Sequence, residues 1–368
     1  MAEQLKLIYN QDFFEALIPN IQKTLPNVNS KDFLSLIYAS NWEDLELKQR
    51  MRRISDVLGQ YLNQDYSIGV KQLVEIYKHV SKSKMNTLGF EFMFFPDYIE
   101  VNGLEYFEDS MSAMEEITKQ VSCEFAIRPF FIKYPDQTLR QMIDWSKHSN
   151  AMVRRLATEG ARPRLPWAMA LPKFKNNPKP ILPILKRLRN DDSESVRRSV
   201  ANNLNDISKD NPEVVYNLVK GWKGESKDVD WVVKHACRTM LKQGLPHIMT
   251  LFNYSPVEYL EIGDIQIKTP EVKIGEALQF EFQLKNITEK IVKVRIEYGL
   301  YFKKANGTLA KKVFKISEKD YKPLENVLID RKQSFKIIST RKLYTGEHGV
   351  ALIVNGVEFK MQSFKLKD

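Results

Sequence analysis

Two hydrophobic periods divide this chain of 368 residues. From Lys6 to about Asn253, apolar residues recur every three or four positions, which is the period of an amphipathic helix. Beyond Asn253, apolar and polar residues alternate, for example over 278–284, as they do in a strand with one buried face. We therefore expect two domains, an all-α domain over residues 1–254 and an all-β domain over residues 255–368.

The helical part repeats one short segment three times. The copies are centred on Val153, Val196 and Val233, which are 43 and 37 residues apart, and each joins a Val/Leu/Ala stripe to adjacent basic residues. Each copy is expected on the second helix of a pair, and such pairs are typical of HEAT-like repeats. One pair cannot bury its own apolar face, so the pairs stack into a solenoid with a concave surface. The first helices are expected over 137–147, 180–188 and 212–222.

The basic residues of these segments fall on the helix face that the apolar stripe leaves free. A solvated helix face is one interpretation, and contact with the phosphates of a duplex is the other. Three recurrences of the pattern favour phosphate contacts. The residues expected to bind DNA on these helices are Arg155, Arg197, Arg198, Lys234 and Arg238.

The β part has the turn signals of a sandwich. Asn306-Gly307 and Asn355-Gly356 each lie between alternating runs, as a two-residue hairpin turn with two positive φ angles requires. About seven short strands predict an immunoglobulin-like β-sandwich. From Pro256 to Asp368 there are 21 Lys and Arg against 15 Asp and Glu. The residues expected to hold a phosphate backbone are Lys303, Lys304, Arg341 and Lys342, although solubility alone also explains such residues.

Charge and cysteine content narrow the class of protein. The net charge of +10 and the pI near 9.2 favour a polyanionic partner such as nucleic acid. Only Cys123 and Cys237 are present, too few for a disulfide framework or a structural zinc site, so both are expected to be reduced core residues. The start of the sequence lacks the pattern of a secretory signal, and we expect a cytoplasmic protein.

Candidate chemistry is limited to carboxylates and aromatic residues. The sequence shows no glycine-rich nucleotide loop, no cluster of metal ligands and no nucleophile elbow. The most unusual segment is 157–167, in which a helix is expected to end at Gly160 and two prolines stiffen the next turn. This segment brings together Glu159, Arg162, Arg164 and Trp167.

Four segments resemble AlkC-type DNA alkylation-repair glycosylases, which are related to the AlkD-type HEAT-like repeat enzymes. They are residues 45–51, 123–130, 159–167 and 202–210. The resemblance spans nearly the whole chain, because AlkC-type members add an immunoglobulin-like domain that AlkD-type members lack. It implies excision of N3-methyladenine and N3-methylcytosine from duplex DNA by a monomer that needs no cofactor and no metal.

The resemblance also implies an active site made of Glu124, Glu159 and Asp206, with Trp167 beside them. A base methylated at N3 is already cationic and leaves as a neutral molecule, so the charge to be stabilised develops on the deoxyribose. We assign Asp206 to water positioning and sugar stabilisation, Glu159 as its partner and Glu124 as a third acidic wall, while the Trp167 indole favours a cation.

Each of these residues also has an ordinary explanation. Arg155, Arg162 or Arg164 either offsets the carboxylate charge or holds a flanking phosphate. Without the resemblance, the acidic residues would be solvated or helix-capping groups, and Trp167 would be a core residue. The main functional alternative is a non-catalytic scaffold that binds nucleic acid or an acidic protein.

Overall fold

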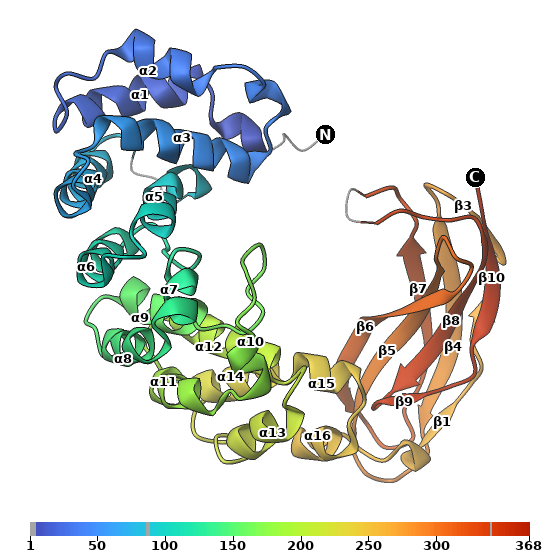
Figure 1. Cartoon of the computed structure of the whole chain (residues 1–368). Coiled ribbons are helices and arrows are strands. Elements are labelled where there is room, and N and C mark those ends of the chain that lie inside the picture. Colours follow the sequence, from blue (N-terminus) through green and yellow to red (C-terminus); the bar gives the residue numbers. More distant parts are fainter. Residues whose placement is uncertain (1–4, 86–88, 339–340) are drawn as a thin grey trace. The chain divides into compact units, whose positions relative to one another are not determined.

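The computed structural model describes residues 5–85, 89–338 and 341–368. These residues form two compact units, one up to Ala236 and one that begins at Cys237 (Figure 1). Helices alone build the first unit, and the second joins short helices to two β-sheets. Within the described ranges, no helix combines the length and apolar character that a membrane crossing requires.

The first unit is a series of α-helices and short 3-10 helices (η). In chain order they are η1 (Leu5–Ile8), α1 (Gln11–Gln22), α2 (Ser30–Ile37), η2 (Trp42–Asp44), α3 (Leu47–Tyr61), α4 (Tyr66–Ser81), η3 (Phe90–Phe92), α5 (Phe94–Asn102), α6 (Phe107–Thr118), α7 (Ile127–Lys133), α8 (Pro135–Trp145), α9 (Ala151–Glu159), α10 (Pro172–Asn176), η4 (Lys179–Ile181), α11 (Leu182–Leu188), α12 (Glu194–Ile207), α13 (Pro212–Lys220) and α14 (Lys227–Ala236).

The three predicted repeats are confirmed as the helix pairs α8–α9, α11–α12 and α13–α14. Each second helix buries the valine of its repeat completely, and α9, α12 and α14 pack side by side in that order (Figure 1). Local signals set the helix starts: the Asn150 side chain accepts hydrogen bonds from the first turn of α9, and Pro212 opens α13. The repeats therefore form one stack that buries its apolar stripes between neighbouring pairs.

The second unit contains α15 (Arg238–Lys242), α16 (Pro246–Leu251), η5 (Val257–Tyr259) and two sheets. The strands are β1 (Leu260–Ile262), β2 (Gln266–Ile267), β3 (Glu271–Lys273), β4 (Ala277–Asn286), β5 (Val292–Lys303), β6 (Leu309–Tyr321), β7 (Asn326–Ser334), β8 (Gly346–Val354), β9 (Val357–Glu358) and β10 (Gln362–Lys367). In the first sheet, β4 pairs with β1 and β2 on one edge and with β7 on the other. The second sheet has the strand order β3-β10-β8-β5-β6, and β9 pairs with the end of β8.

The sandwich core follows the alternation of the sequence. Leu278, Phe280, Phe282 and Leu284 of β4 are buried, and the residues between them are less so. They pack against the buried residues of β5 and β8 in a single cluster. The prediction of a helical solenoid followed by a β-sandwich is confirmed, although the strands number ten in the described residues and not about seven.

One of the two predicted two-residue hairpin turns is confirmed, and the other is wrong. Asn355 and Gly356 have φ angles of 45° and 82° and join β8 to β9 as a two-residue turn, as predicted. At Asn306-Gly307 only the glycine has a positive φ, of 80°. The backbone N–H of Lys304 donates to the Thr308 carbonyl, so the turn between β5 and β6 is longer than the predicted two residues.

Helices α15 and α16 belong to the unit of the sandwich. Gly244 of their linker packs directly against Gly356, and a Cβ on Gly244 would lie 2.4 Å from the Gly356 carbonyl oxygen. Lys293 of β5 donates to the carbonyl of Phe252, just after α16. The compact unit therefore begins earlier in the chain than the change from helices to strands, near which we expected the domain border.

His348 of β8 lies in the sandwich core, where it contacts the rings of Phe302, Phe335 and Phe364. Burial lowers the pKa of this imidazole, although the nearby Tyr344 carbonyl opposes the shift. The ordinary pKa of a histidine is about 6.5, so below that pH the unfolded chain takes up a proton that the folded chain excludes.

We therefore expect the stability of this unit to fall as the pH drops through about 6.5. Thermal unfolding of the full chain from about pH 7.5 to about pH 5.5 measures the effect. His348→Gln, which does not titrate, should show a smaller loss over the same range. An equal loss in both proteins would contradict the assignment to His348.

Candidate active site

The C-terminal end of α9 presents a charged face to the next repeat. Arg155, Thr158, Glu159 and Arg162 are spaced three, four and seven residues apart, so they lie on one side of the helix and its continuation. The helix ends at Glu159, one residue before the predicted Gly160, which caps it in an ordinary right-handed conformation. A Cβ there would lie 2.6 Å from the Ile127 side chain, so close packing requires the glycine.

Helix α12 faces this end of α9 with three polar residues. Ser199, Asn203 and Asp206 recur at intervals of four and three residues, on one face of the helix, and all three are buried. The Ser199 hydroxyl donates to Glu159 at 2.6 Å, and the Asn203 amide donates to the Thr158 carbonyl at 2.8 Å. The packing of two neighbouring repeats therefore brings Glu159 and Asp206 into one cluster.

Arg162 joins the two carboxylates. Its Nη1 lies 2.6 Å from Glu159 Oε1 and its Nε lies 2.8 Å from Asp206 Oδ2. The side chain of Asp206 is only 2% exposed, and its other oxygen accepts a hydrogen bond from Lys209 at 3.0 Å. Burial alone would lower the pKa of Arg162, but the two carboxylates outweigh it and raise that pKa, so the guanidinium stays charged.

Glu124 joins the cluster through Arg155. The Arg155 Nη1 lies 2.9 Å from Glu124 Oε2, and its Nη2 lies 3.9 Å from Glu159 Oε1. Ser122 also donates to Glu124 at 2.7 Å. Glu124 is the most accessible of the three acidic residues, with 16% of its side chain exposed. The structure thus brings Glu124, Glu159 and Asp206 into one ion-pair network, which excludes the explanation that they are solvated surface groups.

Arg128 is a buried cation that forms no ion pair with a carboxylate in the part of the chain that the structure describes. It lies one turn after Glu124 and donates to the carbonyls of Gly160, Arg162 and Met169. Its Nη2 has no partner among the described residues. Burial, and then the charge of Arg162, lowers the pKa of Arg128 to about 10, and it therefore remains charged at neutral pH. The charge of Arg128 interacts with all three carboxylates of the cluster, and its hydrogen bonds hold the chain that follows α9.

Trp167 lies at the surface of that chain and not in the core, because 60% of it is exposed. Its φ of 64° is disfavoured for a residue with a side chain, at a cost on the order of 1–3 kcal/mol. Its ring lies 6.1 Å from the ring of Phe90, and its carbonyl accepts a hydrogen bond from Lys48. These interactions reach the N-terminal helices; within the described ranges, the indole makes no ring contact or hydrogen bond with the three carboxylates.

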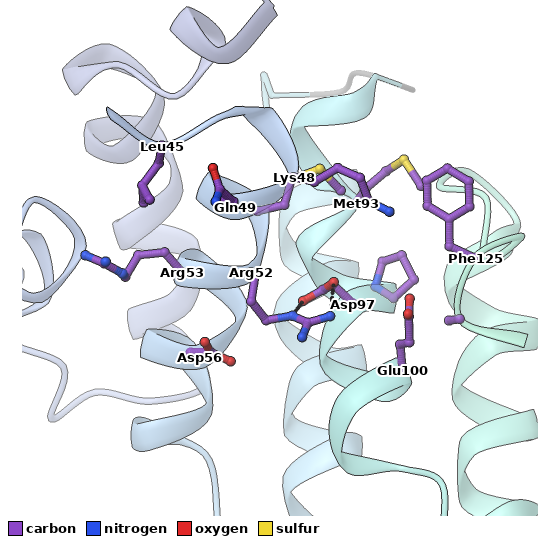
Figure 2. Close-up of a pocket in the computed structure, with 13 residues that line it drawn as sticks. Leu45, Lys48, Gln49, Arg52, Arg53, Asp56, Met93, Asp97, Glu100 and Phe125 are labelled. Atoms are coloured by element: carbon purple, nitrogen blue, oxygen red, sulfur yellow. Dashed lines mark hydrogen bonds and ion pairs between the residues drawn. The ribbon is translucent and has the colours of Figure 1, made fainter. Parts of the chain in front are cut away.

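A pocket of about 460 Å³ lies between α3 and α5 and is closed by Phe125 and Ala126, the residues that follow Glu124 (Figure 2). Figure 2 shows Lys48 reaching across it towards the ring of Phe125. Arg52 and Asp97 form a bidentate ion pair in its wall. Burial raises the pKa of Glu100, and the charge of Asp97 adds to the shift.

The other basic residues expected to bind DNA have diverse surroundings. The side chain of Arg197 is largely buried. It donates hydrogen bonds to the carbonyls of Asp191 and Asp192 and forms an ion pair with Asp228. Arg164 pairs with Asp210 at the surface. Arg198 lies over the ring of Trp231, which stacks on His235 of the next turn of α14. Lys234 is on α14, and Arg238 opens α15 in the second unit.

In the sandwich, the four expected DNA-binding residues flank two loops. Lys303 and Lys304 lie at the β5–β6 turn, and Lys303 donates to the Thr345 carbonyl. Arg341 stacks on the ring of Phe302 at 4.0 Å, and Lys342 lies over Tyr344. Cys123 and Cys237 are buried and form no disulfide within the described residues.

Sequence reasoning missed several members of the network. Ser199 precedes Asp206 by seven residues on the same face of α12, and Lys209 follows Asp206 by three residues, just beyond the end of that helix. Helical spacing from Asp206 was the available signal for these two. No such signal exists for Arg128 or Lys48, because they reach the cluster and the Trp167 segment through tertiary packing.

Two protein-family models match the chain. One is described as "DNA alkylation repair enzyme" and matches residues 118–245, which include all three acidic residues and Trp167. The other is described as "Uncharacterised protein YhaZ, C-terminal Ig-like domain" and matches residues 261–368.

Two individual proteins match over nearly their whole length. The chain is 40% identical to the "Uncharacterized protein YhaZ" of Bacillus subtilis (strain 168) over 352 residues, which cover 96% of each protein. It is 33% identical to the Pseudomonas fluorescens alkylpurine DNA glycosylase AlkC, whose structure was solved bound to DNA containing an abasic site analogue. That structure matches with a TM-score of 0.92 and covers 100% of both chains.

Proposed function

Because the chain belongs to the AlkC-type family of DNA alkylation repair enzymes, we propose that it is a DNA glycosylase acting on alkylated duplex DNA. Its substrates on this proposal are the cationic bases N3-methyladenine and N3-methylcytosine, and the bond broken is the N-glycosidic bond. On this proposal the helical domain expected over residues 1–254 carries the chemistry, and the immunoglobulin-like domain expected over residues 255–368 assists DNA binding. We expect the protein to act as a cytoplasmic monomer.

The observation that carries this proposal is the cluster of Glu124, Glu159 and Asp206. Three carboxylates from three separate segments of the chain meet in one network, although burying them costs solvation. A network that only stabilised the fold would need no more than one buried ion pair. A cluster of fixed negative charge instead suits a reaction in which positive charge develops on a bound sugar.

The reaction needs little acid catalysis. The methylated base carries a positive charge and becomes neutral when it takes both electrons of the bond to C1′, so no proton has to be donated to it. The deoxyribose becomes an oxocarbenium-like cation, which a preorganised carboxylate stabilises. Asp206 orients the attacking water and receives its proton, Glu159 supports Asp206, and the Glu124 carboxylate completes the acidic wall.

Accessible cations control how much negative charge the site presents. Lys209 and Arg155 are the more exposed partners, at 39% and 22%, whereas Arg162 is almost enclosed. When DNA phosphates approach, Lys209 and Arg155 can turn to them. This releases one oxygen of Asp206 and removes the ion pair of Glu124, whose Oε2 keeps its hydrogen bond from Ser122. Arg162 then remains to hold Glu159 and Asp206 in place. The exposed indole of Trp167 offers its face to the cationic lesion or the sugar.

The proposed activity is tested by incubating the purified full chain with methylated duplex DNA and separating the released bases by chromatography. We expect free N3-methyladenine and N3-methylcytosine and an abasic site in the DNA, with no metal or cofactor added. Tight DNA binding without any released base would contradict the activity and favour a non-catalytic scaffold.

A second test concerns the basic loops of the sandwich. Replacing Lys303, Lys304 and Lys342 together by alanine should reduce the slope of log affinity against log salt, by about 0.9 for each phosphate that the variant no longer binds. The control replaces Lys315, Lys319 and Lys367, which are ion-paired elsewhere on the same unit, and changes the net charge equally. Equal slopes in the two variants would show that these loops do not bind phosphates.

A further inference from the structure

The segment from Gly160 to Leu171 carries Trp167 on a backbone that needs external support. Trp167 has a positive φ and is exposed, so neither its own conformation nor core packing holds it in place. Within the segment, the Leu171 N–H donates to the Pro163 carbonyl and the Ala168 N–H donates to the Leu165 carbonyl at 3.4 Å. These two bonds close the loop, and the ion pairs of Arg162 with Asp206 and of Arg164 with Asp210 hold its first limb, but none of these contacts holds Trp167 itself.

Two cations from outside the segment supply that support. Arg128 of α7 donates to the carbonyls of Gly160 and Arg162 on one limb and to the Met169 carbonyl on the other. Lys48, in the first turn of α3, donates to the Trp167 carbonyl at 2.9 Å. Arg128 therefore binds both limbs of the loop, and Lys48 binds its tip.

Lys48 also contacts the segment of Glu124. Its ammonium lies 4.8 Å from the centre of the Phe125 ring, in the pocket of Figure 2. One side chain of the N-terminal helices thus links the residue after Glu124 to the backbone of Trp167. We propose that Lys48 and Arg128 are positioning residues that fix the Trp167 indole relative to the carboxylate cluster, a role that rests on the proposed glycosylase function.

The test uses Lys48, because Arg128 is buried and its replacement endangers folding. Lys48→Met removes the ammonium, keeps the aliphatic stem and lies at an exposed position. We expect unchanged thermal stability, a changed ¹⁹F signal from fluorotryptophan at Trp167, and an excision rate about tenfold lower in single-turnover conditions. Lys48→Arg, which can still donate to the carbonyl, should restore the rate to within about threefold of wild type.

Two controls separate positioning from other roles. Lys147→Met removes an exposed, ion-paired lysine that lies just after α8 and should change neither signal nor rate. In a Trp167→Ala background, Lys48→Met should cause no further loss of rate, because both changes act through one indole. Additive losses, as expected if Lys48 binds a phosphate directly, would overturn the proposal, and so would an unchanged ¹⁹F signal. The signal is read without substrate, so this test and that of the glycosylase activity fail independently.

Discussion

Asp206→Asn is expected to slow base release by about a hundredfold while leaving DNA affinity within a few-fold of wild type. The amide keeps the size of the side chain but removes the negative charge that faces the developing sugar cation. Phosphates are bound by basic residues, so binding is largely unaffected. The measurement is the single-turnover rate of N3-methyladenine release at saturating protein, together with the affinity for undamaged duplex.

The matched control for this substitution is Asp210→Asn. Asp210 lies four residues further along the chain, beyond the end of α12, and its ion pair with Arg164 is at the surface. The pKa of its carboxyl is lowered chiefly by hydrogen bonding to Arg164, but it does not contact the cluster. Both variants lose one negative charge, and only Asp206→Asn should lose activity. Equal rates in the two would remove Asp206 from the catalytic set.

Arg162→Met is expected to destabilise the helical unit by about 3–5 kcal/mol, because it leaves two buried carboxylates without their shared cation. For a unit of this size the loss corresponds to a fall in Tm of roughly 6–20 °C. Thermal unfolding of the full chain, followed by far-UV circular dichroism, measures the shift of the helical transition.

Arg164→Met is the control for Arg162→Met. Arg164 and its partner Asp210 are 38% and 25% exposed, and exposed ion pairs contribute about 1 kcal/mol or less. A fall in Tm as small for Arg162→Met as for Arg164→Met would mean that the buried network is relaxed or hydrated in solution, and it would weaken the case for a preorganised carboxylate cluster.

The sequence predicted the fold well where a single hydrophobic period continued through a whole helix or strand. The repeat helices α9, α12 and α14 and the strand β4 lie where their hydrophobic periods place them. The prediction was wrong at Asn306, where the chain prefers a longer turn, and it gave too few strands. The additional strands include β3, which pairs with the distant β10, and a local pattern does not encode such long-range pairing.

The candidate site was harder to predict than the fold. The family resemblance identified Glu124, Glu159 and Asp206 as site residues. Their spacing in the sequence alone does not distinguish them from other acidic residues. Their ion pairs with Arg155 and Arg162 form for two reasons. Helices α9 and α12 pack side by side, and the segment before α7 brings Glu124 against Arg155 of α9. Long-range packing of this kind leaves no mark on the local sequence.

The central claim is that this cluster stabilises positive charge on a sugar. Duplex DNA with a cationic aza-sugar at the lesion position imitates that charge, and a neutral tetrahydrofuran in its place does not. We expect the full chain to bind the cationic duplex at least about tenfold more tightly, and Asp206→Asn to lose most of that preference. Equal affinity of the wild-type protein for both duplexes would contradict the account.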